Sequence, residues 1–390
     1  MQIGLILLTV AYVLSQFFRA FLAVLSGPLQ QDLGVDAEAL AFASGLWFIS
    51  FAAMQIPVGW ALDTIGPKRT ASALMLVGCG GGAMLFAAAG SALHINLAMI
   101  LIGIGCSPVL MASFYIFARE FSPQKFATLA GLIIGIGTLG NLISSYPMAL
   151  AEDLVGWRTS MLALAGLSAL VAVGVQFTVR DPAKAQATTK GSLLDLLRMP
   201  VIWLILPIAL VNYMPPGAIR GIWIGPYLQD VFGYDTAQVG IASMVMSAAM
   251  IGGVLLYGPL DRIFGTRKWV IVAGSALTLV CIGWLWMFPA ASPVVSIAMM
   301  SGVGFFGATF PVIMAHGKSF FPAHLAGRGV TLLNLFGIGG VGLAQFATGR
   351  LHTAYQGSDV TAPYTAVFGF LGLMLAVGLA LYLFSKDNTG

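Results

Sequence analysis

Residues 29–44 read LQQDLGVDAEALAFAS, and residues 228–243 read LQDVFGYDTAQVGIAS. The two stretches share Leu, Gln, Gly and Asp positions and the same final Ala-Ser pair, at an offset of 199 residues. Two further pairs repeat at nearly the same interval: SPVLMA (107–112) with FPVIMA (310–315), and GIGTLG (135–140) with GIGGVG (337–342). An internal duplication of one structural unit is the simplest explanation for these matches.

The composition places both copies in a membrane. Of the 390 residues, 59% are hydrophobic and 8% are charged, whereas a soluble globular domain carries roughly 25% charged residues. A membrane-spanning helix needs about 20 apolar residues, so twelve spans would use roughly 240 residues plus loops. Apolar runs bounded by charge, Pro or Gly predict an all-α polytopic protein with spans at 3–29, 38–62, 70–89, 93–118, 126–151, 158–179, 200–228, 236–258, 269–289, 293–317, 329–350 and 363–385.

The positions of the basic residues predict the orientation of these spans. With both termini in the cytoplasm, the inner loops and the tail hold all of the 18 Lys and Arg residues except Arg19, Arg158, Arg220 and Arg350. This is the asymmetry expected of inner loops, and it favours a bacterial inner-membrane protein. The longest polar connection, 181–199, is predicted to be a cytoplasmic linker between an N-terminal six-helix bundle (1–180) and a C-terminal one (200–390).

Several other classes of protein are disfavoured. The net charge of +4 comes from scattered basic residues, and nucleic-acid binding needs a dense patch. The three cysteines lie in apolar runs without CxxC spacing, so neither a disulfide framework nor a zinc site is indicated. The apolar N-terminus has no basic leader region or A-x-A-like cleavage site, and Arg19 interrupts it, so we expect a first membrane helix.

Two loops at equivalent places in the repeats carry a recognisable motif. The loop after the second span reads GWALDTIGPKR (59–69), and the loop after the eighth reads GPLDRIFGTRK (258–268). They resemble the G-x-x-x-D-[RK]-x-G-[RK]-[RK] signature of the major facilitator superfamily, although Thr64 replaces a base and Pro67 displaces the basic pair. The resemblance implies two pseudo-symmetric six-helix bundles that transport a solute by alternating access, with no enzyme activity or cofactor. It also implies gating roles for Gly59, Asp63, Gly66, Lys68, Arg69, Gly258, Asp261, Gly265 and Arg267.

The glycine-rich segments do not indicate a nucleotide site. GIGTLG and GIGGVG both satisfy G-x-G-x-x-G, but neither follows a strand or opens a βαβ unit. Small residues at this spacing let membrane helices pack closely, so we expect both segments within helices. Without an ATP site, the driving force should be an ion gradient or an exchange gradient.

Two arginines are the charges predicted deepest in the membrane. Arg19 and Arg220 lie in duplicated spans, and an ionisable group at that depth costs at least about 2.5 to 3.5 kcal/mol, so each should face a cavity or a partner. Pro215-Pro216-Gly217 should interrupt the seventh span and aim a helix N-terminus inward beside Arg220. We therefore predict binding of a small organic anion, a carboxylate or phosphate ester, by Arg19, Arg220, Tyr12, Gln16, Asn141, Asn212, Asn334 and Gln345.

Other interpretations remain open at this point. Arg220 could instead reach the outer surface, and Arg19 could bind backbone carbonyls in a structural role. The solute could also be neutral or a drug. Met246, Met250 and His316 could bind copper or another metal, although Met is also a common apolar filler. A membrane sensor or assembly factor would usually carry an added soluble domain. Because no carboxylate or histidine falls in the middle of a predicted span, proton coupling and anion exchange are equally open. We also expect the protein to be a monomer in the bilayer.

Overall fold

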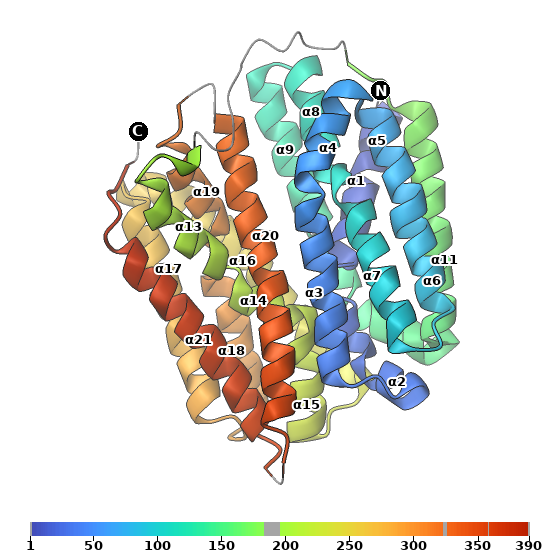
Figure 1. Cartoon of the computed structure of the whole chain (residues 1–390), viewed down its shortest axis with the longest axis vertical. Coiled ribbons are helices and arrows are strands. Elements are labelled where there is room, and N and C mark those ends of the chain that lie inside the picture. The colour runs from blue at the N-terminus through green and yellow to red at the C-terminus, as the bar shows by residue number, and fades with distance from the viewer. Residues whose placement is uncertain (1, 183–195, 323–325, 358, 389–390) are drawn as a thin grey trace. The chain divides into compact units, whose positions relative to one another are not determined.

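A computed structural model describes residues 2–182, 196–322, 326–357 and 359–388 (Figure 1). All regular secondary structure in these ranges is helical. The chain forms two compact units. Unit 1 contains Met1–Gln186 and Thr236–Gly240, and unit 2 contains Ala187–Asp235 and Ile241–Gly390. Most of the predicted linker, 183–195, lies outside the described residues.

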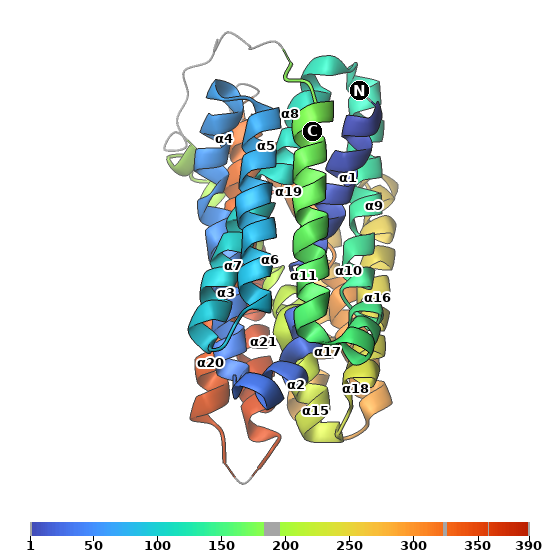
Figure 2. The same cartoon turned by 90° about the vertical axis from the view of Figure 1, so that its right-hand side faces the viewer.

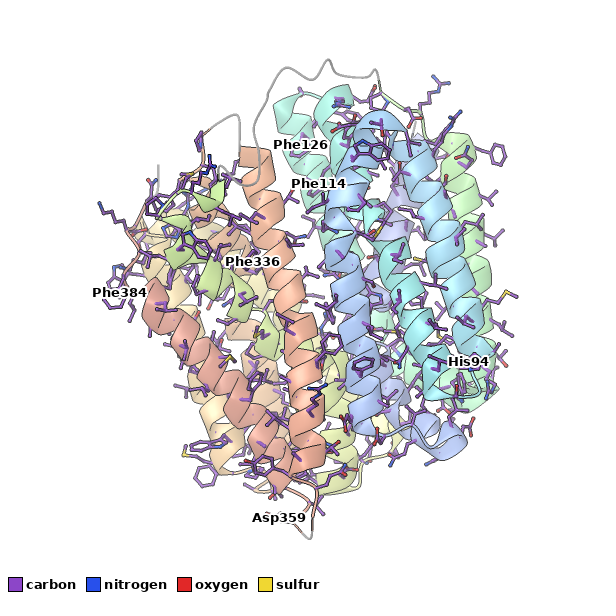
Figure 3. The ribbon with its side chains drawn as sticks, in the orientation of Figure 1. His94, Phe114, Phe126, Phe336, Asp359 and Phe384 are labelled. Carbon is purple, nitrogen blue, oxygen red and sulfur yellow. The ribbon has the colours of Figure 1, made fainter. Side chains whose placement is uncertain are left out.

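Unit 1 consists of membrane-length helices and shorter segments. In chain order these are α1 (Gln2–Phe17), α2 (Leu22–Leu33), α3 (Ala37–Ala53), α4 (Gln55–Thr64), α5 (Pro67–Leu74), the π-helix η1 (Met75–Gly81), α6 (Gly82–Ala87), α7 (Ala92–Cys106), α8 (Pro108–Glu120), α9 (Pro123–Gly137), α10 (Leu139–Ile143) and α11 (Tyr146–Thr178). Consecutive segments join into longer spans at Ala37–Thr64, Pro67–Ala87 and Ala92–Glu120. Figure 3 places His94 at one end of this unit, with Phe114 and Phe126 near the other.

The first span of unit 1 is broken. α1 and α2 meet at an angle of 54°, and residues 18–21 between them include Arg19 but no Pro or Gly. Phe17, Phe18 and Phe21 pack together at this break, with ring centroids 5.6–5.9 Å apart. Phe21 also packs on Phe86 of α6 at 5.3 Å. Aromatic packing, rather than a helix-breaking residue, therefore accompanies the bend.

The fifth and sixth spans meet at Gly156. The helix α11 changes direction there, because Gly156 has φ 78° and ψ 156°, a conformation outside the helical region. A residue with a side chain is strained at such a positive φ. The part of α11 before Gly156 follows α9 and α10, and the part after it forms the sixth span, close to the predicted boundary at 151–158.

The glycine-rich segment of unit 1 lies within helices, as predicted. α9 and α10 pack along α1 (Figure 2). A methyl group added at Gly140 would overlap the carbonyl oxygen of Val13, and one added at Gly137 would overlap the ring of Tyr12. The glycines therefore permit close helix packing.

Unit 2 repeats this organisation. Its helices are α13 (Ile202–Val211), α14 (Met214–Ala218), the π-helix η2 (Ile219–Trp223), α15 (Ile224–Phe232), α16 (Thr236–Phe264), α17 (Lys268–Met287), α18 (Pro293–Phe306), α19 (Phe310–Lys318), α20 (Ala326–Ala354) and α21 (Ala362–Tyr382). Figure 3 shows Asp359 and Phe384, which flank α21, at opposite ends of the unit. The second glycine-rich segment lies inside α20, where a methyl group at Gly340 would overlap the carbonyl oxygen of Leu210.

Most of the twelve predicted spans are found as membrane-length helices. Among the described residues, ten helices are long and apolar enough to cross a membrane, and the bent pair α1–α2 would make an eleventh. The shorter apolar stretch Thr128–Ile143 belongs to the fifth span, which Gly156 ends. Each of the twelve predicted spans thus has a helical counterpart.

The predicted interruption of the seventh span lies just before the prolines, where α13 ends and α14 begins. Residues Ile202–Phe232 form one membrane-length span, with a turn at Asn212 and Tyr213 only. Pro215 and Pro216 occupy the first turn of α14, where proline is tolerated because the missing N–H would have no intrahelical partner. Arg220 then lies inside η2, so no half-helix begins beside it and the dipole argument for an anion there is lost.

Candidate functional site

Arg19 lies in the break of the first span and is enclosed by aromatic rings. Its guanidinium carbon is 5.5 Å from the ring centroid of Trp47 and 5.2 Å from that of Phe51. Both rings belong to α3, are buried and stack on each other at 5.2 Å. Cation–π contacts of this kind hold a guanidinium in place without neutralising its charge.

The charge of Arg19 has no acidic partner in the part of unit 1 that the structure describes. The ion pair described within this unit joins Asp63 and Arg119. The Nε atom of Arg19 is buried without a hydrogen-bond partner among the described residues. A buried donor in this state is costly, so the side chain is suited to receiving an acceptor from outside the unit.

Other predicted site residues of unit 1 lie near the same helix. Gln16 donates from Nε2 to the Tyr12 hydroxyl at 2.8 Å, and both side chains are buried. They belong to α1, and Arg19 follows the end of this helix at Phe17. Asn141 lies half-buried on α10, which packs against α1. Unit 1 therefore brings Tyr12 and Gln16 together and holds Asn141 on a neighbouring helix.

In unit 2, Arg220 is almost fully buried, with 2% of its surface exposed. Its Nη2 donates to the hydroxyl of Tyr213 at 3.2 Å. Since Arg220 and Arg19 belong to different units, the expectation that they face one another stays a prediction.

The predicted amides of unit 2 have structural contacts. Asn212 donates from Nδ2 to Thr309 Oγ1 at 2.9 Å and to Ser275 Oγ at 3.4 Å, joining the seventh span to α19 and α17. Gln345 donates from Nε2 to the carbonyl oxygen of Ala218 at 3.4 Å. Both amides are fully buried, and Asn334 is half-buried on α20. Asn212 and Gln345 therefore have helix-bridging roles whether or not they also contact a solute.

The first predicted gating motif pairs with a residue outside it. Asp63 lies 3.7 Å from the guanidinium of Arg119 at the end of α8, and that guanidinium stacks on Tyr115 at 3.6 Å. The motif residue Gly66 has φ 110° and ends the loop, so that α5 begins at Pro67. The backbone N–H of Lys68 donates to the carboxylate of Asp181 at 2.8 Å. Sequence spacing alone did not indicate the contributions of Arg119 and Asp181.

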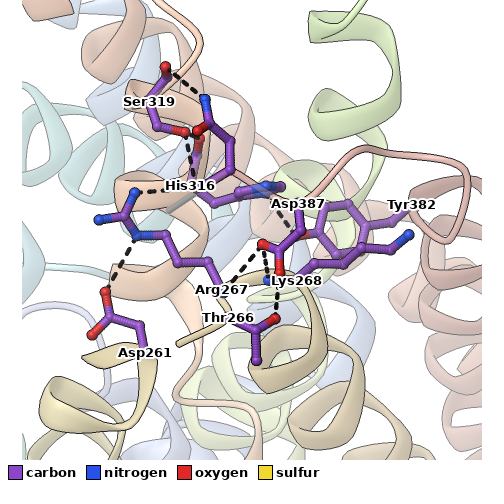
Figure 4. Close-up of polar contacts among 9 residues, drawn as sticks. Asp261, Thr266, Arg267, Lys268, His316, Ser319, Tyr382 and Asp387 are labelled. Carbon is purple, nitrogen blue, oxygen red and sulfur yellow. Dashed lines mark hydrogen bonds and ion pairs between the residues drawn. The ribbon is translucent and has the colours of Figure 1, made fainter. Parts of the chain in front are cut away.

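The second motif is held by the C-terminal tail (Figure 4). Arg267 donates from Nε to Asp261 at 3.2 Å. Asp387 accepts from the hydroxyl of Thr266 and from the backbone N–H groups of Arg267 at 3.3 Å and Lys268 at 3.1 Å. Gly265 has φ 63°, and Gly258 has open space around it, as a Cβ there would meet no atom within 4 Å.

Each motif is therefore capped by an aspartate that the family signature does not contain. In unit 1, Asp181 follows the sixth span and accepts from the first turn of α5; in unit 2, Asp387 follows α21 and accepts from the start of α17. Desolvation raises the pKa of Asp387, but the bonds from Thr266, Lys268 and Arg267 outweigh it and hold the pKa below its ordinary value. An acid at a helix N-terminus also benefits from the helix dipole.

The metal alternative gains no support from these residues. His316 uses both ring nitrogens, since Nδ1 contacts the Tyr382 hydroxyl at 2.8 Å and Nε2 contacts the carbonyl oxygen of Lys386 at 3.1 Å. Met246 is buried and Met250 is half-buried, and both lie against Gly304. No group of three or more His, Cys, Asp or Glu side chains that could hold a metal ion occurs among the described residues.

One buried histidine was missed by the sequence analysis. The eleventh span was predicted to end at residue 350, but α20 continues to Ala354 and includes His352, which is 4% exposed. The ring of His352 packs against Trp223 and Tyr364. The signal that could have found it is the continuation of the helical pattern past Arg350.

Comparisons with known proteins agree with this architecture. The probable sulfoacetate transporter SauU of Cupriavidus necator is 22% identical over 72% of this chain and 69% of its own length. An MFS-type efflux pump of Mycolicibacterium smegmatis is 26% identical over 66% of this chain, which spans 62% of the pump. A bacterial homologue of the human lysosomal transporter Spinster, solved in an inward-facing and occupied conformation, superposes with a TM-score of 0.81 at 17% identity, covering 98% of this chain and 96% of its own.

A comparison with whole families of sequences identifies the family. The sequence profile of the Major Facilitator Superfamily matches residues 8–345, which include both repeats, both loop motifs and most of the helices described above. The chain is therefore an integral membrane protein and a member of the Major Facilitator Superfamily of secondary transporters.

Proposed function

We propose that this protein transports a small organic anion, a carboxylate in particular, by alternating access between its two halves. The observation that carries the proposal is Arg19. A permanently charged guanidinium lies at a break in a membrane helix, held by Trp47 and Phe51, without an acidic partner among the described residues of its unit. Arginine presents planar donors that match a carboxylate or phosphate.

The names of several relatives support an acidic solute. Besides the probable sulfoacetate transporter, they include a probable L-galactonate transporter of Escherichia coli, 22% identical over 70% of this chain, and a putative tartrate transporter of Agrobacterium vitis, 24% identical over 70%. The compounds named are all carboxylates. The distribution of Lys and Arg further supports a bacterial inner-membrane location with both termini cytoplasmic.

The first test is a thermal-shift screen of the purified protein with sulfoacetate, L-galactonate, D-glucarate, tartrate, xylose and ethidium. A solute that binds only the folded protein raises its apparent stability. We expect one or more of the carboxylates to stabilise the protein, and xylose and ethidium to have no effect. Stabilisation by xylose or ethidium alone would overturn the anion assignment and, for ethidium, would favour drug efflux.

The second test is Arg19→Lys, which keeps the charge but removes the planar donor set. Losing a charge-assisted contact costs about 1.5 to 3 kcal/mol, or roughly ten- to a hundredfold in affinity. Arg350→Lys is the matched control, because Arg350 is exposed. Arg158 is a poorer control, since it donates to the carbonyl oxygens of Ala87 and Ala89. If Arg19→Lys binds the carboxylate as tightly as the wild type, Arg19 does not hold it.

A further inference from the structure

A cluster of buried rings in unit 2 surrounds His352. The centroid of its imidazole lies 5.1 Å from that of Trp223 and 5.1 Å from that of Tyr364. Trp223 belongs to η2, Tyr364 to α21 and His352 to α20, so three spans meet at this imidazole. All three side chains are at least 95% buried.

The cluster continues to an exposed carboxylate. The hydroxyl of Tyr364 donates to Oδ2 of Asp230, which is exposed at the end of α15. The helix α15, which carries Asp230, and Asp359, which precedes α21, lie at the end of unit 2 opposite its C-terminus (Figures 1 and 3). This end is predicted to face away from the cytoplasm. Tyr364 thus lies between the exposed carboxylate of Asp230 and the buried imidazole of His352.

The cluster also includes a near neighbour in sequence of Arg220, the residue of unit 2 that the sequence predicts to bind the anion. Trp223 follows Arg220 by three residues within the same π-helical turn, and its Nε1 donates to Thr348 Oγ1 at 2.9 Å, which fixes the indole beside α20. π-helical segments inside membrane helices are often functional. A charge that appears on His352 would therefore act close to the segment that carries Arg220.

Histidine is the residue whose charge ordinarily changes between about pH 5 and 8. Tyr364 of α21 is the titratable side chain in ring contact with His352, and Gln356 Nε2 lies 3.4 Å from its Nδ1. Tyr227 and Asp230 of the seventh span contact Tyr364 in turn, Arg220 shares η2 with Trp223, and Arg350 is exposed on the helix of His352. Tyr227 is tied to Ser296 Oγ at 2.9 Å and to the carbonyl oxygen of Pro289. Of these side chains, histidine is the type that ordinarily exchanges a proton near neutral pH.

We propose that His352 is the proton-coupling residue of this transporter. Protonation adds a positive charge near Arg220 and favours anion binding, and by linkage a bound anion favours protonation of His352 by the same factor. The proton comes from water and returns to water with the anion. This inference rests on the proposed function, since it supplies the coupling that the sequence left open between proton symport and anion exchange.

The first experiment measures D-glucarate binding by titration calorimetry at pH 8 and pH 6. Coupling between sites is typically 5- to 150-fold, so wild-type affinity should rise by roughly fivefold or more at pH 6. His352→Gln, or His352→Asn if the first variant does not fold, should change less than about twofold between the two pH values. The matched control is His316→Gln, which should keep the wild-type dependence. Equal wild-type affinities at both pH values, or a wild-type dependence in His352→Gln, would overturn the proposal.

The same experiment separates this proposal from the one on which it rests. Arg220→Lys should weaken D-glucarate binding at both pH values while the ratio between them persists. If neither D-glucarate nor the other carboxylates bind the wild type, the proposed function fails. The protonation of His352 is then tested by a measurement that needs no ligand.

That ligand-free measurement uses tryptophan fluorescence, because a protonated imidazole in contact with an indole quenches its emission. Wild type and His316→Gln should gain emission as the pH rises from about 5 to 8. The His352→Gln variant and Trp223→Phe should both lack that component. If the pH-dependent change in emission persists in His352→Gln, another group causes it, and the assignment of proton binding to His352 is overturned.

Discussion

Asp387→Asn is the substitution that tests most directly how the C-terminal tail holds the second motif. Asp387 accepts from Thr266, Arg267 and Lys268 at the start of α17. Loss of a capping side chain costs typically about 1 kcal/mol. Because Asp387 is exposed, solvent screens its charge, and the electrostatic part of that loss should be small.

The assay is thermal unfolding in detergent, followed by intrinsic fluorescence. For a domain of this size, 1 kcal/mol corresponds to a shift of roughly 2–4 °C in Tm. Lys386→Gln is the control, since the exposed Lys386 contributes its backbone carbonyl to His316, which the substitution leaves intact. A double-mutant cycle with Thr266→Val should show a coupling of about 0.5 kcal/mol or more.

The pH dependence gives an independent check. The folded-state pKa of Asp387 lies below its ordinary value, so its contribution to stability is present above the unfolded-state pKa of about 3.9 and is lost as the pH falls through the folded-state pKa. The difference in Tm between wild type and Asp387→Asn should therefore persist at pH 7 and shrink in acid. An equal Tm at pH 7, or no coupling with Thr266→Val, would refute the view that this carboxylate caps α17.

Two further predictions concern unit 1. Gly140→Ala should destabilise the protein by about 1 to 3 kcal/mol, as overpacking does, because its methyl group would overlap the carbonyl oxygen of Val13. The control is Gly131→Ala, which should leave the Tm unchanged because its methyl group would meet no atom within 4 Å. Equal Tm values for the two variants would contradict the close packing at Gly140. Asp63→Asn breaks a partly exposed ion pair with Arg119, so the free energy of unfolding should change by less than about 1 kcal/mol. Solute uptake into vesicles should nevertheless fall. Uptake at the wild-type rate would show that Asp63 has no gating role.

The sequence by itself determined the class of fold. The repeats at 29–44 and 228–243, the apolar runs and the two loop motifs are local or periodic signals, and the bilayer requires apolar residues along every span. The glycine-rich segments were also readable as packing surfaces, because helical spacing places small residues on one face.

Tertiary structure decided how the candidate site is built. The break at Arg19 contains no Pro or Gly and depends on Phe17, Phe18 and Phe21 packing together, whereas the prolines before Arg220 fit into a continuing span. The partners Asp181 and Asp387 lie more than 100 residues from the loops they cap. Such contacts form between residues distant in sequence and leave no periodic signal, so only the fold brings the two carboxylates to their helix ends and His352 to its rings.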